Sequence, residues 1–199
     1  MLRPPLTSVN PIYRSVVLIQ LLAMTDMKEA ILNAAERRAR RAGYNGFSFR
    51  DLADDVRIKS ASVHHHFPTK VALMEALAER YLERTRIELG DPERLSPRSA
   101  IKRLADLFLF SNETENQMCL CGLLAAEADA IPESLLPKVT AYFELIERWL
   151  SPALKRATHA PKPVEVIASL EGAILVARAR RDPAVLRSVV SALQGRVRE

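Results

Sequence analysis

Three consecutive histidines, His64-His65-His66, and two cysteines, Cys119 and Cys121, are the residues with the most obvious chemical capacity. Imidazole and thiolate groups both bind zinc, so a metal site is the first chemistry to consider. Neighbouring residues on a helix point about 100° apart, and three consecutive histidines therefore cannot converge on one ion. The Cys-x-Cys pair supplies only half of a tetrahedral site, and no histidine-rich motif follows it. The sequence predicts no metal ion and no other cofactor.

The two cysteines leave two interpretations open. Cys119 follows Glu115-Asn116-Gln117, where a helix could begin, and a helix N-terminus lowers a thiol pKa enough to favour reaction with oxidants or electrophiles. Free cysteines are also common as small apolar residues in protein cores. The chain does not have the pattern of a disulfide-stapled secreted domain, which favours a cytoplasmic location.

A third pattern, between residues 48 and 67, is suited to reading DNA. Ser48 and Asp51 have the spacing of a capping box, which opens a helix of two turns. Its buried stripe follows the i, i+3, i+4, i+7 spacing and comprises Phe49, Leu52, Ala53 and Val56. After the break Arg57-Ile58-Lys59, a second helix spans about residues 60–67, where only Val63 and Phe67 are clearly apolar. Its other positions are small or polar, which lets a helix enter the major groove and hydrogen-bond to base edges.

The DNA contacts are expected on this second helix and around it. Small residues at its start allow a close approach of the backbone, the histidines reach further out, and lysines on either side offer phosphate contacts. The net charge of +5 is compatible with a polyanionic partner but does not demonstrate one. The predicted DNA-binding residues are Ser48, Arg50, Lys59, Ser60, Ala61, Ser62, His64, His65 and Lys70.

Helices must position these residues, because the chain has no strand-period run of useful length and few glycines. Asp26, with Glu29 three residues later, predicts a helix that begins at residue 26 and stops at Gly43. Thr69 caps a helix that runs to about Leu89, and further helices are expected at 97–111, 116–130, 133–157, 162–181 and 183–195. The fold class is therefore all-α. Residues 1–25 are expected to form a loose extension, since their apolar run at 16–24 is too short to cross a membrane and no signal-peptide cleavage site follows it.

Four stretches resemble the N-terminal domain of TetR-type regulators. In order they are Ile31-Leu32-Asn33-Ala34-Ala35, Gly43-Tyr44, Phe49-Arg50-Asp51-Leu52-Ala53 and Ile58-Lys59-Ser60-Ala61-Ser62-Val63-His64-His65-His66-Phe67-Pro68-Thr69-Lys70. Two later stretches are similar to parts of these regulators, the run 119–127 to a subset of them and the run 171–179 to their dimer-forming helix. The resemblance implies a three-helix DNA-binding domain at 26–72 and a helical ligand-binding and dimerisation domain at 73–199.

The resemblance assigns base reading to the helix at 60–65, a phosphate contact to Lys70, and packing roles to Val63 and Phe67. Two residues depart from the family pattern. Arg57 stands where a glycine is usual, at a cost of about 1 kcal/mol if the position keeps a positive φ. His64 stands where a tyrosine usually touches phosphate, so that contact is lost, water-mediated or pH-dependent.

The resemblance further implies a homodimeric repressor that releases double-stranded operator DNA when a small molecule, or a thiol-reactive compound, binds the second domain. The predicted ligand-binding residues, each of which also suits a core, are Leu104, Phe108, Met118, Cys119, Cys121, Tyr142, Phe143, Ile146 and Arg178. The alternative is a DNA-binding transcription factor without a small-molecule effector. An enzyme is not expected, because the chain has no nucleophile elbow, phosphate loop, paired carboxylates or full metal-ligand set.

Overall fold

The computed structural model describes residues 11–115 and 117–198, and its regular elements in those segments are helices. A single bridge between His159 and Arg198 is the one exception. The α-helices are α1 (Pro11–Ala42), α2 (Phe49–Val56), α3 (Ser60–His66), α4 (Lys70–Leu89), α5 (Pro97–Glu115), α6 (Leu120–Ala126), α7 (Leu136–Leu154), α8 (Pro163–Arg180) and α9 (Ala184–Gly195). The prediction of an all-α chain is confirmed.

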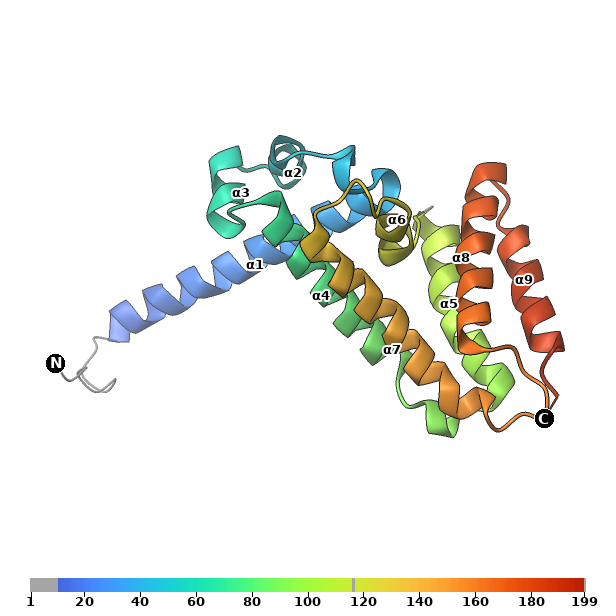
Figure 1. Ribbon diagram of the computed structural model, residues 1–199. Helices are drawn as coiled ribbons and strands as arrows, with labels where there is room; N and C mark the ends of the chain where they lie inside the picture. The colour runs from blue at the N-terminus through green and yellow to red at the C-terminus, as the bar shows by residue number, and fades with distance from the viewer. Residues whose placement is uncertain (1–10, 116, 199) are drawn as a thin grey trace.

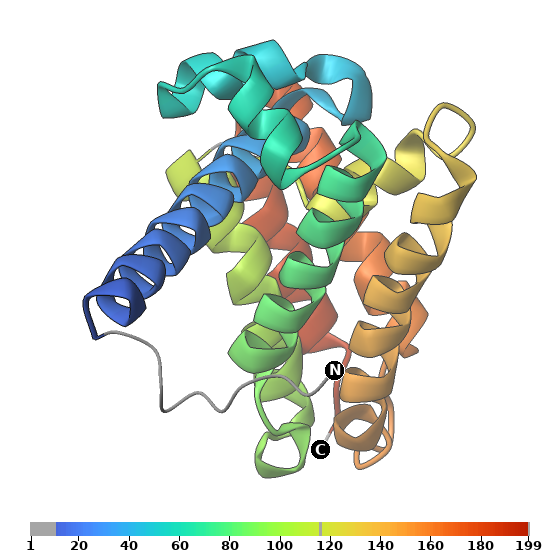
Figure 2. The same cartoon turned by 90° about the vertical axis from the view of Figure 1, so that its left-hand side faces the viewer.

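The helices form a small cluster at one end of a larger bundle (Figures 1 and 2). Helix α2 packs on α1 and on α3, and α4 leads from this cluster into the bundle. Helices α8 and α9 lie side by side on the far side of the bundle from α3. The predicted domain division at residue 72 falls inside α4, which packs against both α1 and α7.

Helix α1 begins at Pro11, so the prediction of a helix start at Asp26 was wrong. No glycine and no further proline occurs between residues 12 and 42, and proline is well tolerated at the first helical position. Nothing in the sequence therefore interrupts the helix before Gly43. Residues 1–10 of the expected extension lie outside the described residues. Among the described helices, none combines the length and the apolar character needed to cross a membrane.

One helix was expected at 116–130, but among residues 117–130 the α-helix covers α6 alone, at Leu120–Ala126. The backbone of Met118 forms its hydrogen bonds with Arg40 of α1 instead. The Met118 N–H donates to the Arg40 carbonyl at 3.2 Å, and the Met118 carbonyl accepts from Arg40 Nε at 2.7 Å. Both backbone groups of Met118 are thus satisfied outside a helix. Residues 117–119, which precede α6, have no regular secondary structure and are called the strap below. Helix α5 in turn runs on to Glu115, past the expected end at residue 111.

Candidate DNA interface and ligand cavity

The turn between α2 and α3 has the geometry that the sequence predicts. Ser48 N–H donates to Asp51 Oδ2 at 2.7 Å and Asp51 N–H donates to Ser48 Oγ at 3.3 Å, which confirms the capping box. Arg57 ends α2 with a φ of 57°, the left-handed conformation in which glycine is usual. Two hydrogen bonds close this end, from Arg57 N–H to Asp54 O and from Ile58 N–H to Ala53 O. The packed turn thus holds a non-glycine residue in a strained conformation.

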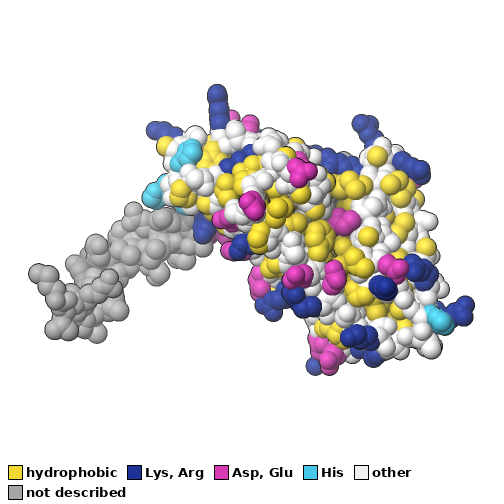
Figure 3. All heavy atoms as spheres, in the orientation of Figure 1, with side chains coloured by type: hydrophobic (Ala, Val, Ile, Leu, Met, Phe, Trp, Pro, Cys, Tyr) yellow, Lys and Arg dark blue, Asp and Glu magenta, His cyan; other side chains and the backbone are white. Residues whose placement is uncertain are grey.

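Helix α3 presents one buried side and one open side. Val63 and Phe67 are buried, 0% and 3% exposed, as predicted. The open side carries the predicted contact residues: Lys59, Ser60, Ala61, His64 and His65 are exposed, and Ser62 is half-buried. His64 lies edge-on against Phe49, with ring centroids 4.7 Å apart, which fixes its position on the helix. Lysine, arginine and histidine side chains occupy this end of the molecule in Figure 3.

Helix α2 is held on α1 by a charged contact. Arg38 donates to both carboxylate oxygens of Asp55, at 2.6 and 2.8 Å, and lies 4.0 Å from Asp51. The Arg38 hydrogen bond is the main cause of an Asp55 pKa below its ordinary value. Ser48 and Arg50 are exposed at the start of α2.

Lys70 is engaged within the protein. Its Nζ donates to the Phe47 carbonyl and lies over the rings of Tyr44 and Phe47, 4.9 and 4.3 Å from their centroids. Burial lowers the pKa of the ammonium, while Asp51 and Glu127 act in the opposite direction. Lys70 thus fixes the loop that joins α1 to α2. A contact from Lys70 to phosphate stays a prediction, and it would compete with these bonds.

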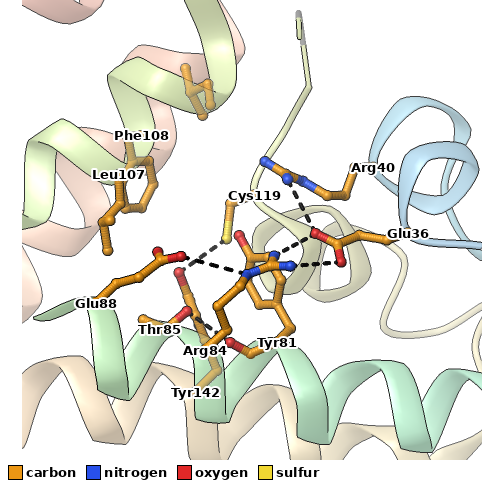
Figure 4. Close-up of a pocket in the computed structure, with 11 residues that line it drawn as sticks. Glu36, Arg40, Tyr81, Arg84, Thr85, Glu88, Leu107, Phe108, Cys119 and Tyr142 are labelled. Atoms are coloured by element: carbon orange, nitrogen blue, oxygen red, sulfur yellow. Dashed lines mark hydrogen bonds and ion pairs between the residues drawn. The ribbon is translucent and has the colours of Figure 1, made fainter. Parts of the chain in front are cut away.

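The end of α1 together with α2 and α3 forms the candidate DNA-binding cluster. A cavity of about 430 Å³ lies behind it, between α1, α4, α5, α7 and α8 (Figure 4). Three of the predicted ligand-binding residues, Phe108, Cys119 and Tyr142, line it. The other lining residues, which the sequence interpretation missed, are Glu36, Arg40, Tyr81, Arg84, Thr85, Glu88, Leu107 and Ile174. The wall is therefore part apolar and part strongly charged.

The remaining predicted ligand-binding residues have other positions. Phe143 packs edge-on against Tyr142, with ring centroids 5.5 Å apart. Arg178 donates from Nη2 to the Arg41 carbonyl at 2.5 Å. The other four predicted residues belong to the core and do not line the cavity: Leu104, Met118, Cys121 and Ile146. Periodicity identifies such residues as buried, but it does not separate a cavity wall from a filled core.

The charged part of the wall is centred on Glu36. Arg84 donates to both Glu36 oxygens at 2.5 and 3.1 Å, Arg80 donates at 2.9 Å, and Arg40 donates at 3.3 Å. Burial by itself raises the pKa of Glu36, but the three guanidinium groups outweigh it and the pKa lies below its ordinary value. Arg40 and Arg84 also lie 5.6 and 5.2 Å from the centre of the Tyr81 ring. The (i, i+4) spacings of Glu36–Arg40 and Arg80–Arg84 are visible in the sequence, but the pairing of α1 with α4 is not.

Cys119 caps α6, at the helix start that the sequence suggested, where its Sγ accepts from Gly122 N–H at 3.4 Å. The thiol also donates to Tyr142 Oη at 3.6 Å. Burial, reinforced by the carboxylate of Glu171, nevertheless raises the pKa of Cys119 far above its ordinary value. Burial and the neighbouring Cys119 likewise raise the pKa of Cys121. Both groups are therefore neutral thiols at pH 7, which argues against a reactive thiolate.

No group of three or more histidine, cysteine or acidic side chains in the described part of the chain is arranged to hold a metal ion.

Hydrogen bonds join the end of α1 and the turn after it to the bundle. In addition to the strap at Met118 and the bond from Arg178, Glu127 accepts from Tyr44 N–H at 2.7 Å. Gly43, between these contacts, has a φ of 76° and a ψ of −171°. A Cβ on Gly43 would lie 1.8 Å from Glu127 Oε1, so the carboxylate occupies the space that a side chain would need.

Two family models match the chain in order. Residues 31–77 match the model described as bacterial regulatory proteins of the tetR family, and residues 97–192 match that of the C-terminal domain of LmrA/YxaF-like transcriptional regulators. Among curated proteins, an HTH-type transcriptional regulator in the lacX 3′ region of Lactococcus lactis subsp. lactis is 23% identical over 83% of this chain and 90% of its own.

Solved structures agree with these matches. A TetR transcriptional regulator from Legionella pneumophila is 32% identical, with a TM-score of 0.80 over 86% of this chain and 97% of that one. A TetR-family regulator from Agrobacterium tumefaciens is 26% identical, with a TM-score of 0.81 over 88% of this chain and 100% of that one. The family models, the fold and the helix-turn-helix geometry lead to one conclusion: the chain belongs to the TetR family of bacterial transcriptional regulators.

Proposed function

We propose that this TetR-family regulator is a homodimeric repressor that releases its operator DNA when a small molecule enters the cavity. Members of the family are DNA-binding transcription factors and not enzymes. The observation that carries the proposal is that Glu36 and Arg40 belong to α1 of the DNA-binding cluster and also line the cavity. A molecule bound there touches the helix on which α2 packs, and α2 in turn packs on α3. As a DNA-bound regulator, the protein is proposed to act in the cytoplasm.

The DNA contacts are proposed to come from the open side of α3. Its exposed residues are small near the start of the helix and longer at His64 and His65, which suits a helix inserted into the major groove. In a two-fold dimer, the two copies of α3 would enter successive major grooves about 34–36 Å apart. Arg50 and Lys59, exposed on either side of the turn, are available for phosphate contacts that fix the register.

The dimer is proposed to form through α8 and α9. Val164, Leu175 and Val176 on α8 are 51%, 52% and 41% exposed, which is unusual for residues of this type. Val164 and Leu175 are eleven residues apart, about three turns, and therefore lie on the same side of the helix. Apolar side chains are visible over this helix in Figure 3. The exposed residues of α9 include a small set that permits close helix packing: Ala184, Ser188, Ser191 and Ala192.

Ligand response requires that the ligand bind one conformation better than another. The ion pairs of Glu36 with Arg80 and Arg84 join α1 to α4, and the bonds of Arg40 join α1 to the strap before α6. A ligand that rearranges either set changes the angle between the DNA-binding cluster and the bundle. In a dimer this alters the spacing of the two α3 helices, and the affinity for a fixed operator falls.

The test begins by selecting bound fragments from random DNA with the purified protein. The selected sequence should be pseudo-palindromic, and its affinity should fall steeply with salt. Lys59→Gln should weaken binding and reduce the slope of log affinity against log salt by about 1, whereas Lys155→Gln, at the remote end of α7, should leave both unchanged. The absence of salt-sensitive, sequence-preferring binding would refute the proposal.

A further inference from the structure

The geometry points to the chemical class of the ligand: a carboxylate with a largely apolar body, whose anionic group competes with Glu36 for Arg84. This inference rests on the proposed function of the cavity as the effector site. It concerns the Glu36 cluster and the apolar wall that faces it (Figure 4).

The Glu36 cluster joins one buried carboxylate to three arginines. Glu36 is 8% exposed at its side chain and receives hydrogen bonds from Arg40, Arg80 and Arg84. Two further carboxylates pair with the same arginines, that of Glu29 with Arg80 and that of Glu88 with Arg84, and both side chains are about half exposed. Glu88 also lines the cavity. One buried carboxylate thus shares three guanidinium groups, and two of them, Arg40 and Arg84, line the cavity.

The opposite side of the cavity is apolar. Leu107 and Phe108 of α5 lie across the cavity from Glu36 and Arg40 in Figure 4, and Ile174 of α8 completes this wall. The volume of about 430 Å³ is in the range of small-molecule sites, about 300–1,000 Å³. A ligand that fills it therefore needs an apolar body at one end and a group that suits guanidinium at the other.

A carboxylate is the group that fits the charged end. The planar fork of an arginine matches the two oxygens of a carboxylate, and Arg84 already holds Glu36 in this bidentate way. An amine cannot accept the hydrogen bonds of the Arg84 guanidinium, and a neutral amide does not compensate its charge. Arg84 is also 40% exposed at its side chain, so it can turn toward an arriving anion without leaving a closed core.

The competition would act directly on the tie between α1 and α4. When a ligand carboxylate takes the Arg84 fork, Glu36 keeps Arg40 and Arg80 but loses its two bonds to Arg84. The ligand replaces the charge that Arg84 gives up, so no guanidinium is left unpaired in the cavity. Helix α1 is then held to α4 by one ion pair of Glu36 in place of two.

The first experiment compares matched probes by calorimetry and thermal shift. The carboxylates are benzoate, 2-naphthoate and octanoate, each paired with its primary amide and with the corresponding amine. The expected result is that at least one carboxylate binds about tenfold more tightly than its amide and that the amines do not bind. Equal binding of acid and amide, preferred binding of an amine, or no binding of any carboxylate would overturn the inference.

Variants place the binding at this cluster. Arg84→Gln should weaken the carboxylate at least about tenfold, and Arg84→Lys should weaken it less. Arg86→Gln is the matched control, because Arg86 pairs with Glu83 on the exposed side of the same helix. Glu36→Gln should tighten binding several-fold, since it removes the competitor, and a merely damaged fold would not produce that gain. Circular dichroism checks the fold of each variant. Unchanged affinity in Arg84→Gln, or weaker binding in a folded Glu36→Gln, would overturn the inference.

The operator provides an independent measurement. If carboxylates bind at Arg84 but do not release the DNA, the ligand class stands and the proposed ligand response fails. If a neutral or cationic compound binds the cavity and releases the DNA while no carboxylate binds, the proposed response stands and the inference of a carboxylate fails.

Discussion

Replacing Gly43 by alanine should damage two features at once, the backbone of the turn after α1 and the contact of Glu127 with that turn. Gly43 has a φ of 76° with a ψ of −171°, a combination that residues with a Cβ rarely adopt. The new Cβ would also lie 1.8 Å from Glu127 Oε1, so the carboxylate must move away. Tyr44 N–H, which donates to the same carboxylate at 2.7 Å, then loses its acceptor.

The two costs can be separated. The backbone strain is about 1–3 kcal/mol for a non-glycine residue in this region. A hydrogen bond to a charged group contributes about 1.5–3 kcal/mol, and partial exposure of the pair reduces this to about 1–2 kcal/mol. Gly43→Ala should therefore lower the free energy of unfolding by about 2–5 kcal/mol. In a Glu127→Ala background only the strain remains, so the same change should cost about 1–2 kcal/mol less.

Urea denaturation of the wild type, both single variants and the double variant measures this coupling, provided that the m-value is unchanged. Operator affinity and its response to ligand should be recorded on the same four proteins, since the contact joins α6 to the DNA-binding cluster. Equal costs of Gly43→Ala in the two backgrounds would refute the role assigned to Glu127. A total cost well below 1 kcal/mol would refute the strain argument as well.

Three further outcomes are expected. Leu175→Glu should convert the proposed dimer to monomer in analytical ultracentrifugation and weaken operator binding. Ile87→Glu, at an exposed apolar residue of α4, should leave that dimer intact. An unchanged dimer in Leu175→Glu would exclude α8 from the interface. Cys119 and Cys121 should react with a thiol reagent only after unfolding, because both are buried with raised pKa values, and rapid titration of the native protein would contradict this. Burial raises the pKa of Glu171 to about 7, so the folded state binds the proton of this carboxyl group more tightly than the unfolded state does. The free energy of unfolding should therefore fall by about 1–3 kcal/mol as the pH rises from 5 to 8. Glu171→Gln should remove most of that fall in pH-dependent denaturation, and an unaltered pH profile would show that Glu171 is not its source.

The features that the sequence predicted are those set by neighbours in the chain. The capping box of Ser48 and Asp51 joins residues three positions apart, and the buried pair Val63 and Phe67 lies on one helical turn. Arg57 stands where the family resemblance places a glycine, and the structure shows that this position does have a positive φ. Such signals give the fold class and the exposed side of α3, because local spacing alone decides them.

The features that were missed depend on contacts between distant segments. A helix was expected through Met118, but Arg40 occupies both of its backbone groups, and no pattern near residue 118 indicates this. The apolar part of the cavity was foreseen at Phe108 and Tyr142, whereas its charged part was not. Glu36 and Arg84 come together because α1 and α4 pack in one particular register, which a single sequence does not specify.

The bonds at the end of α1 also join parts of the chain that are synthesised far apart in time. A helix leaves its last carbonyls without partners of its own, and here those of Arg40 and Arg41 are satisfied by Met118 and Arg178. These partners follow 78 and 137 residues later in the chain. During synthesis, α1, α2 and α3 emerge long before α8. A nascent chain or a fragment that lacks α8 therefore cannot form the bond from Arg178 to the Arg41 carbonyl, and this contact at the end of α1 is made only when nearly the whole polypeptide has been synthesised.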